Sequence, residues 1–225
     1  MAPRSVLFDF DGTLTRRDTF FAYCMAIARR QEHPVRAMFR VACSMALVKA
    51  RLITNHQLKE RTAAVLLTGE KESHIARIMQ EEGGERLAGK LDTEMVGLLE
   101  RMREAGANVF LVSSSLDCFL RPFGPAWGLR GIIATRTEVI DGRFTGRLIG
   151  RTCNGPEKVA RVIEEVGERE ARESVAYGDS RGDEDLLNFV AEGYRVRRRL
   201  TPGPSRIERV VTGGRAVRDE RRGGN

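Results

Sequence analysis

The sequence predicts an α/β fold: a Rossmann-like parallel sheet with helices on both faces, and a small all-helical cap inserted after the first strand. Two patterns predict it. Short apolar runs alternate with helically spaced segments from about residue 91 onward, as they do in βαβ units. Between the first and second apolar runs the spacing is helical throughout. We therefore expect a core domain of residues 1–14 and 91–225 and a cap domain of residues 15–90.

The first expected element is a short buried strand at residues 5–10, SVLFDF, which ends in carboxylates. Helices follow in the cap. The helix at residues 19–30 repeats apolar side chains at helical intervals, and a proline ends it. The next helix covers residues 35–48, and a third begins where Thr54 or Asn55 can act as its N-cap.

The second cap helix carries an apolar stripe with basic residues around it. We expect this stripe to pack inside the cap, and the alternative is a helix that lies at a membrane interface. The apolar residues are Val35, Met38, Phe39, Ala42, Met45 and Ala46, and the basic ones are Arg36, Arg40, Lys49 and Arg51.

In the core, strands and helices alternate. A helix at residues 93–104 is closed by Gly106 and precedes a strand at residues 108–112. The remaining elements, in order, are a helix from about Asp117, two β-like runs within residues 132–149 joined by the turn Asp141-Gly142, a helix from Pro156 to Val166, a strand at 174–177, a helix at 184–190 and a strand near 194–196.

The net charge of +7 lies at the C-terminal end, because residues 195–225 contain ten Arg and only three acidic residues. Such a segment can meet a phosphate-bearing surface, either an anionic lipid surface or a nucleic acid. The alternative, favoured for residues 213–225, is a solvated tail without a partner. We expect no nucleic-acid partner, and oligomeric state is not predicted.

Carboxylates at Asp9 and Asp11 interrupt the first apolar run, so no signal peptide is expected. The longest uncharged apolar stretch of the cap region, residues 41–48, is far shorter than the roughly 20 residues that a membrane span needs. Four Cys and three His form no zinc or disulfide pattern. We therefore expect a cytoplasmic protein, with any membrane contact peripheral and at the inner face.

The strongest motif is FDFDGTLT, at residues 8–15. An apolar strand brings Asp9 to its C-terminal end, where open α/β sheets bind ligands, and Asp11 follows two residues later. Gly12 permits a tight turn of the backbone. Carboxylates at a strand end can also be structural, as caps or turn formers. The motif favours a catalytic role for both.

The second motif is YGDSRGDEDLL, at residues 177–187, and it again follows a short apolar strand. The carboxylates of Asp179 and Asp183 are the hard oxygen ligands that Mg²⁺ takes. The alternative is a surface loop that leads into a helix with an acidic N-terminus, where Glu184 and Asp185 favour the helix dipole. This alternative suits Glu184 and Asp185 better than it suits Asp179.

Two weaker signals lie between these motifs. Ser113 ends the strand NVFLV, where its hydroxyl and the next backbone N–H could hold a phosphate oxygen. A Ser cluster after a strand is more often a loop or a helix cap. Lys158 lies just inside the helix that begins near Pro156, where a lysine is ordinarily solvated.

Together, these four segments in this order resemble the haloacid dehalogenase superfamily of phosphatases. A helical insert directly after the first motif is similar to the cap of its phosphoserine phosphatase-like branch. Within that branch, three segments look most like phosphatidylglycerophosphatase C and its relatives: FDFDGTLTRRDTF, CNGPEKVARV and YGDSRGDEDLLNFVAEGYRV.

The resemblance implies a role for each matching residue. Asp9 would attack phosphorus and form an aspartyl phosphate, and Asp11 would act as general acid and then as general base. Mg²⁺ would be held by Asp9, Asp179 and the main-chain carbonyl of Asp11, with Asp183 supporting the site. Lys158, together with Ser113 and Ser114, would neutralise the charge of the phosphoryl oxygens.

The substrate is the least predictable feature. Asp18 stands where phosphoserine phosphatases have a Glu that meets the substrate amine, and Ser114-Ser115 and Gly182 also depart from their phosphate loops. We therefore expect a Mg-dependent phosphatase of a phospholipid head group such as phosphatidylglycerophosphate. The alternatives are a phosphatase of a small soluble ester such as phosphoserine or histidinol phosphate, a phosphotransferase, and, least favoured, a non-enzymatic binding module.

Overall fold

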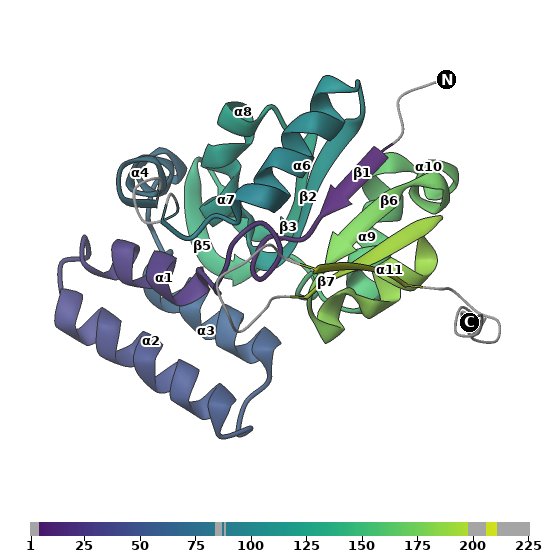
Figure 1. The fold of residues 1–225 in the computed structure, drawn as a ribbon. Coiled ribbons are helices and arrows are strands. Elements are labelled where there is room, and N and C mark those ends of the chain that lie inside the picture. The colour runs from purple at the N-terminus through teal and green to yellow at the C-terminus, as the bar shows by residue number, and fades with distance from the viewer. Residues whose placement is uncertain (1–4, 84–86, 88, 198–205, 211–225) are drawn as a thin grey trace, which may run out of the picture.

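The computed structural model describes residues 5–83, 87, 89–197 and 206–210. Its centre is a six-stranded sheet in the order β3-β2-β1-β6-β7-β8, with helices on both faces (Figure 1). The strands β1 to β3, β6 and β7 pair in parallel, and β8 runs antiparallel to β7. Their bounds are Ser5–Phe8 for β1, Asn108–Leu116 for β2, Gly131–Thr135 for β3, Val175–Gly178 for β6, Glu192–Arg197 for β7 and Arg206–Val210 for β8. The α/β fold class is confirmed.

Alternate residues of the central strands enter two separate cores, because successive side chains of a strand point to opposite faces. On one face, Val6 and Phe8 of β1 join a cluster that includes helix α6 and the helices between β1 and β2. On the other face, Leu7 joins α9, α10 and α11. The helices of the core are α6 (Thr93–Glu104), α7 (Asp117–Leu120), α8 (Gly124–Trp127), α9 (Pro156–Val166), α10 (Glu168–Glu173) and α11 (Glu184–Phe189), with short turns η2 (Arg121–Phe123) and η3 (Arg181–Asp183).

The segment between β1 and β2 is helical, as predicted, and lies to one side of the sheet in Figure 1. It contains α1 (Phe20–Ala28), α2 (Pro34–Lys49), α3 (Asn55–Leu66), α4 (Glu72–Ile78) and η1 (Met79–Gly83). Thr54 caps α3 through a reciprocal capping box with Gln57. At the root of the segment, Asp92 N–H donates to the carbonyl of Leu14 at 2.9 Å and Arg16 N–H to that of Lys90. The predicted boundaries, after residues 14 and 90, fall at this paired crossing, and the division into two domains stays a prediction.

The predicted packing of the second cap helix is wrong by about one residue of rotation. In α2 the buried stripe consists of Ala37, Val41 and Ser44. Of the predicted apolar stripe, Met38 and Met45 are half-buried, whereas Val35, Phe39, Ala42 and Ala46 are exposed. Because α2 is apolar on two opposite sides, the sequence alone does not show which of the two faces inward.

Three strand predictions differ from the structure. β2 continues through the three serines to Leu116, with a register shift against β3 after Val112. Residues 132–149 form three strands instead of two: β3 joins the main sheet, and β4 (Thr137–Ile140) and β5 (Arg143–Leu148) make the separate hairpin at Asp141-Gly142. β8 was not predicted. Of the basic C-terminal segment, residues 198–205 and 211–225 lie outside the described residues.

Candidate active site

The two acidic motifs meet at the carboxyl ends of β1 and β6, which are neighbours in the sheet. From β1 the chain proceeds to β2 and β3 on one side, and β6 and β7 lie on the other, so the strand order reverses between β1 and β6. Open α/β sheets bind ligands at such a switch point. Asp9 follows β1 directly, and its N–H continues the ladder by donating to the Tyr177 carbonyl at 2.8 Å.

Lys158 connects the two motifs. Its Nζ donates to Asp9 Oδ1 at 2.7 Å, to Asp183 Oδ1, and to the main-chain carbonyl of Val112 in β2 at 3.2 Å. The lysine is 2% exposed, so it is not the solvated residue that its helix position alone would suggest. Asp183 is also buried, and its Oδ2 accepts bonds from the N–H and hydroxyl of Ser180 at 2.9 and 2.6 Å.

Burial and mutual charge interactions shift the pKa values of Asp9, Lys158 and Asp183. Burial raises the pKa of Asp9 well above its ordinary value, with Asp183 and Asp179 adding to the effect and Lys158 opposing it. Burial alone would lower the pKa of Lys158, but the two carboxylates outweigh it and raise that pKa. Burial likewise opposes ionisation of Asp183, yet Lys158 and Ser180 hold its pKa below the usual value. We therefore take Lys158 and Asp183 as the charged pair, which leaves Asp9 short of positive charge.

Asp179 completes a set of three carboxylates. Asp9, Asp179 and Asp183 each offer an oxygen within 4.8 Å of the others. Asp179 comes this close because residue 12 is a glycine: a Cβ there would lie 2.0 Å from Asp179 Oδ2, and its φ of +94° also favours glycine. These three carboxylates, two of which contact Lys158, form an oxygen-rich, net negative donor set that fits Mg²⁺.

The Asp11 side chain lies outside this carboxylate set and has its own partners. Its Oδ1 accepts the N–H and the hydroxyl of Thr19, both at 2.7 Å. Burial raises the pKa of Asp11 to about 6, helped by Asp18 and opposed by the Thr19 bonds. Because both bonds reach the same oxygen, they fix the rotamer and leave Oδ2 to carry a proton. A carboxyl group with this pKa can exchange a proton near neutral pH.

The serines predicted to bind substrate lie at the end of β2. The hydroxyl of Ser113 is buried and accepts the N–H of Ser115 at 3.0 Å. The carbonyl of Ser114 accepts the Thr135 hydroxyl at 2.8 Å and also the ammonium of Lys59, from helix α3. The phosphate-binding roles of Ser113 and Ser114 stay predictions.

Lys59 is a site residue that the sequence reasoning missed. It is 3% exposed, and its Nζ lies 5.6 Å from the centre of the Phe20 ring. Burial lowers its pKa to about 8, while the charge of Asp11 raises it and that of Lys158 lowers it further. A signal was available in the sequence: Lys59 shares a helix face with the buried Thr62 and with residues 63 and 66. A lysine on a buried face needs an anionic or polar partner.

Two further residues, Asp18 and Gly182, depart from the phosphoserine phosphatase pattern. Asp18 is exposed, and its Oδ1 accepts the Phe20 N–H at 2.8 Å at the start of α1. Its role toward substrate stays a prediction. A Cβ at Gly182 would lie 1.9 Å from Asn154 Oδ1. The Asn154 carboxamide therefore fills the space that a side chain at residue 182 would need. Glu184 and Asp185 are exposed in the first turn of α11, as the alternative interpretation expected.

Comparison with known proteins gives consistent matches. The sequence profile of the haloacid dehalogenase-like hydrolases matches residues 6–188. The chain is 34% identical over 203 residues to protein CicA of Caulobacter vibrioides, covering 87% of each. It is 25% identical over 200 residues to phosphoserine phosphatase SerB1 of Mycobacterium tuberculosis, covering 85% of this chain and 64% of that protein. A protein of unknown function from Bordetella pertussis has a similar crystal structure, with a TM-score of 0.74, 27% identity and coverage of 83% and 86%.

The close approach of Asp179 to Gly12 predicts that substitution by alanine destabilises the protein more at Gly12 than at Gly106, although the two glycines have a similar conformation. Gly106 has a φ of +85° with nothing near its missing Cβ, so Gly106→Ala should cost about 1–2 kcal/mol of unfolding free energy. Gly12→Ala adds a collision with Asp179 and should cost about 1–3 kcal/mol more. Urea unfolding of both variants measures this, and equal losses would contradict the packing described.

Proposed function

The chain belongs to the haloacid dehalogenase-like hydrolase family, and we propose that it is a Mg²⁺-dependent phosphomonoester phosphatase that acts through an aspartyl phosphate on Asp9. That it is a phosphatase of the phosphoserine phosphatase-like kind follows from the family and its relatives. The metal, the intermediate and the residue roles are the proposal. The observation that carries it is the buried Lys158, which holds Asp9 at the sheet switch point beside Asp179 and Asp183.

In the first step, a carboxylate oxygen of Asp9 forms a bond to phosphorus while the bond from phosphorus to the ester oxygen breaks. The leaving oxygen takes the proton of Asp11 and departs as an alcohol. Lys158 stays beside Asp9 and attracts the phosphoryl oxygens, which reduces the repulsion between an anionic nucleophile and an anionic substrate. Thr19 holds Asp11 in place for the proton transfer.

In the second step, the ionised Asp11 takes a proton from a water molecule, whose oxygen attacks phosphorus. The bond between phosphorus and Asp9 then breaks, and inorganic phosphate leaves. Asp11 is protonated again and Asp9 is restored. An acceptor alcohol in place of water would make the same site a phosphotransferase, which product analysis distinguishes.

A bound metal ion would balance the negative charge of the three carboxylates that Lys158 leaves unbalanced. Asp9, Asp179 and Asp183, with the main-chain carbonyl of Asp11, would hold Mg²⁺, and the bound ion would supply charge neutralisation at the phosphoryl oxygens. It would also meet the need of Asp9 for positive charge, since Lys158 already has Asp183 as a charged partner.

For the substrate, the buried ammonium of Lys59 favours a phosphoester that carries a second anionic group. A phospholipid head group such as that of phosphatidylglycerophosphate has one, and we keep it as the first candidate. Phosphoserine is the second candidate, because it carries a carboxylate and because SerB1 is a relative. Histidinol phosphate has no second anion.

The central test is Asp9→Asn, which keeps the shape of the side chain and removes its nucleophilic charge. We expect release of phosphate from p-nitrophenyl phosphate to fall by at least about 10³-fold. Chelation of metal should abolish the wild-type activity and Mg²⁺ should restore it. Asp185→Asn, on an exposed carboxylate outside the group, is the control and should keep its activity. Full turnover by Asp9→Asn would exclude the mechanism.

The Thr19 bonds predict a pH effect. As a general acid, Asp11 must be protonated, so kcat/KM for an alkyl phosphate should fall as pH rises through about 6. Thr19→Val removes a hydroxyl that favours the ionised form, so the pKa of Asp11 rises. The decrease of kcat/KM with rising pH should then occur about half a pH unit to one pH unit higher than in the wild type. The substrate titrates identically with both enzymes, so the difference isolates Asp11, and an unchanged pH dependence would count against its role.

The position of Lys59 predicts a selective defect. In Lys59→Met, kcat/KM for phosphoserine or phosphatidylglycerophosphate, whichever the wild type prefers, should fall about 10- to 100-fold. For p-nitrophenyl phosphate and histidinol phosphate, which lack a second anion, the loss should stay below about threefold. A uniform loss on all substrates would assign Lys59 to the structure of the site and not to substrate selection.

A further inference from the structure

Helix α2 is apolar on two opposite sides. Its inner side, with Ala37 and Val41, is buried against the other helices of the insert. Its outer face, which we define as Val35, Phe39, Ala42, Cys43 and Ala46, is exposed, with Val35 at 80% and Phe39 at 68%. Single exposed apolar side chains are ordinary, but these five recur at intervals of three and four and form one stripe.

Basic residues border this stripe on both sides. At 100° per residue, Arg36 and Arg40 fall along one edge of the outer face and Lys49 along the other. The helix has no acidic residue between its first and last positions. Among the described residues, no carboxylate forms an ion pair with any of these three, so their charge is directed to solvent. The result is an apolar stripe between two cationic edges.

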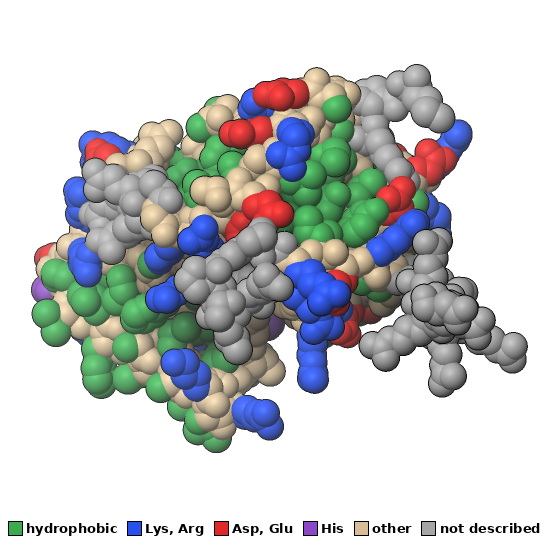
Figure 2. All heavy atoms as spheres, viewed as in Figure 1, with side chains coloured by type: hydrophobic (Ala, Val, Ile, Leu, Met, Phe, Trp, Pro, Cys, Tyr) green, Lys and Arg blue, Asp and Glu red, His purple; other side chains and the backbone are tan. Residues whose placement is uncertain are grey.

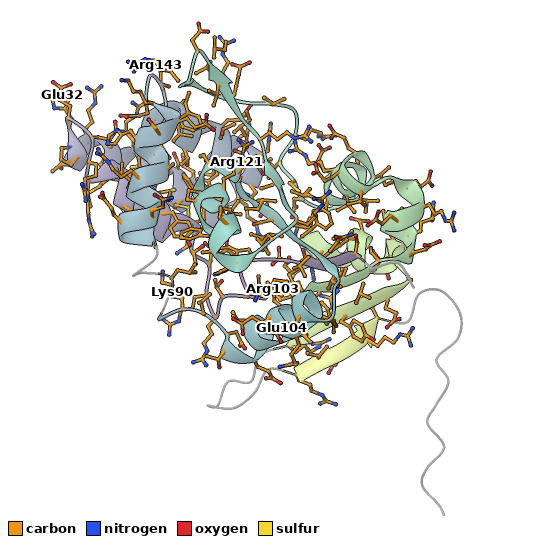
Figure 3. The ribbon with its side chains drawn as sticks, turned by 90° about the horizontal axis from the view of Figure 1, so that it is seen from above. Glu32, Lys90, Arg103, Glu104, Arg121 and Arg143 are labelled. Carbon is orange, nitrogen blue, oxygen red and sulfur yellow. The ribbon has the colours of Figure 1, made fainter. Side chains whose placement is uncertain are left out.

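The place of α2 in the molecule leaves this face accessible. In Figure 1 the helix lies at the outer side of the helical segment, away from the sheet. Figure 2 shows hydrophobic and basic side chains together on that part of the surface. Seen from above, Glu32, just before α2, lies at the far edge of the molecule from Arg103 and Glu104 of α6 (Figure 3). A flat partner could therefore meet the outer face of α2 without touching the sheet.

We infer that the outer face of α2 docks on an anionic lipid surface. Apolar side chains of a helix with basic edges enter the boundary between head groups and acyl chains, and the basic ends meet the lipid phosphates. The aliphatic stems of Arg36, Arg40 and Lys49 extend the apolar area while their charged ends stay in the head-group layer. A second copy of the chain fits poorly, because pairing through this stripe sets cationic edges against cationic edges whichever way the helices run.

This inference is independent of the phosphatase chemistry, because no residue of the outer face belongs to the carboxylate group. It concerns where the protein acts and not which bond it cleaves. Among the described residues, none of the helices has the length and apolar content needed to cross a bilayer. Docking through α2 is therefore a surface contact.

The test is flotation of the full chain with vesicles of phosphatidylcholine alone and of phosphatidylcholine mixed with phosphatidylglycerol. We expect binding only to the mixed vesicles, and a decrease as salt is added. Val35→Ser combined with Phe39→Ser should reduce the bound fraction at least about tenfold. Arg36→Gln combined with Arg40→Gln should reduce it severalfold. Ile140→Ser, at a side chain that is 58% exposed at the end of β4, is the control.

All variants should hydrolyse p-nitrophenyl phosphate at the wild-type rate, which shows that they fold and separates this test from that of the phosphatase. Failure of the wild type to float with anionic vesicles would overturn the inference. So would flotation that the Val35 and Phe39 changes leave intact, because binding would then reside elsewhere, as in the basic C-terminal segment. If the wild type sediments as a dimer and these two changes dissociate it, the partner of the outer face is a second copy of the chain. That result would also overturn the inference.

Discussion

The site depends on one buried ammonium group. Lys158 comes from the first turn of α9, yet its Nζ contacts Asp9 after β1, Asp183 before α11 and the backbone of β2. Buried charges are stable only when they are paired, and removal of one partner typically costs about 3–5 kcal/mol. The lysine therefore holds three separate parts of the chain in a single arrangement. It also fixes the charge balance, because a third carboxylate, Asp179, leaves the group with an excess of negative charge. A bound cation would balance that excess and would also attract the anionic phosphoryl group of a substrate.

The helical insert supplies side chains that contact the candidate active site. Thr19, at the start of α1, fixes the rotamer of Asp11 and limits how far burial raises its pKa. Lys59, from α3, brings a second buried cation to the end of β2. His56 on the same helix contacts the Thr152 hydroxyl at 2.9 Å, next to the loop that leads into α9. The proposed nucleophile thus belongs to the sheet, whereas the proposed proton transfer and substrate recognition depend on the position of the insert.

Local sequence signals predicted most strands of the sheet and the carboxylates of the candidate site. These features depend on consecutive residues, namely a short apolar run and the acidic motif that follows it. The helices α1, α3, α6 and α9 were found from periodicity, caps and Pro positions, and Thr54 was correctly named as a candidate N-cap. Long-range pairing was not visible. β8 was missed because its partner β7 determines it, and the extension of β2 through the serines depends on β3. Lys59 was missed for a similar reason, since only the folded insert shows what its buried face meets. The outward stripe of α2 was predicted to face inward. Helical periodicity shows which residues share a face of the helix, but it does not show what that face contacts.

β8 has a consequence for the behaviour of the protein in concentrated solution. Without it, β7 would present unpaired N–H and carbonyl groups along an open border, which is a template for strands of other molecules. β8 occupies that border and in turn presents a short strand of alternating charge, in which Arg206 and Arg209 flank Glu208. Glu208 is held by Arg197 at 2.7 Å. A strand added from another molecule would have to take these charges out of water, so we expect this end of the sheet to resist edge-to-edge association.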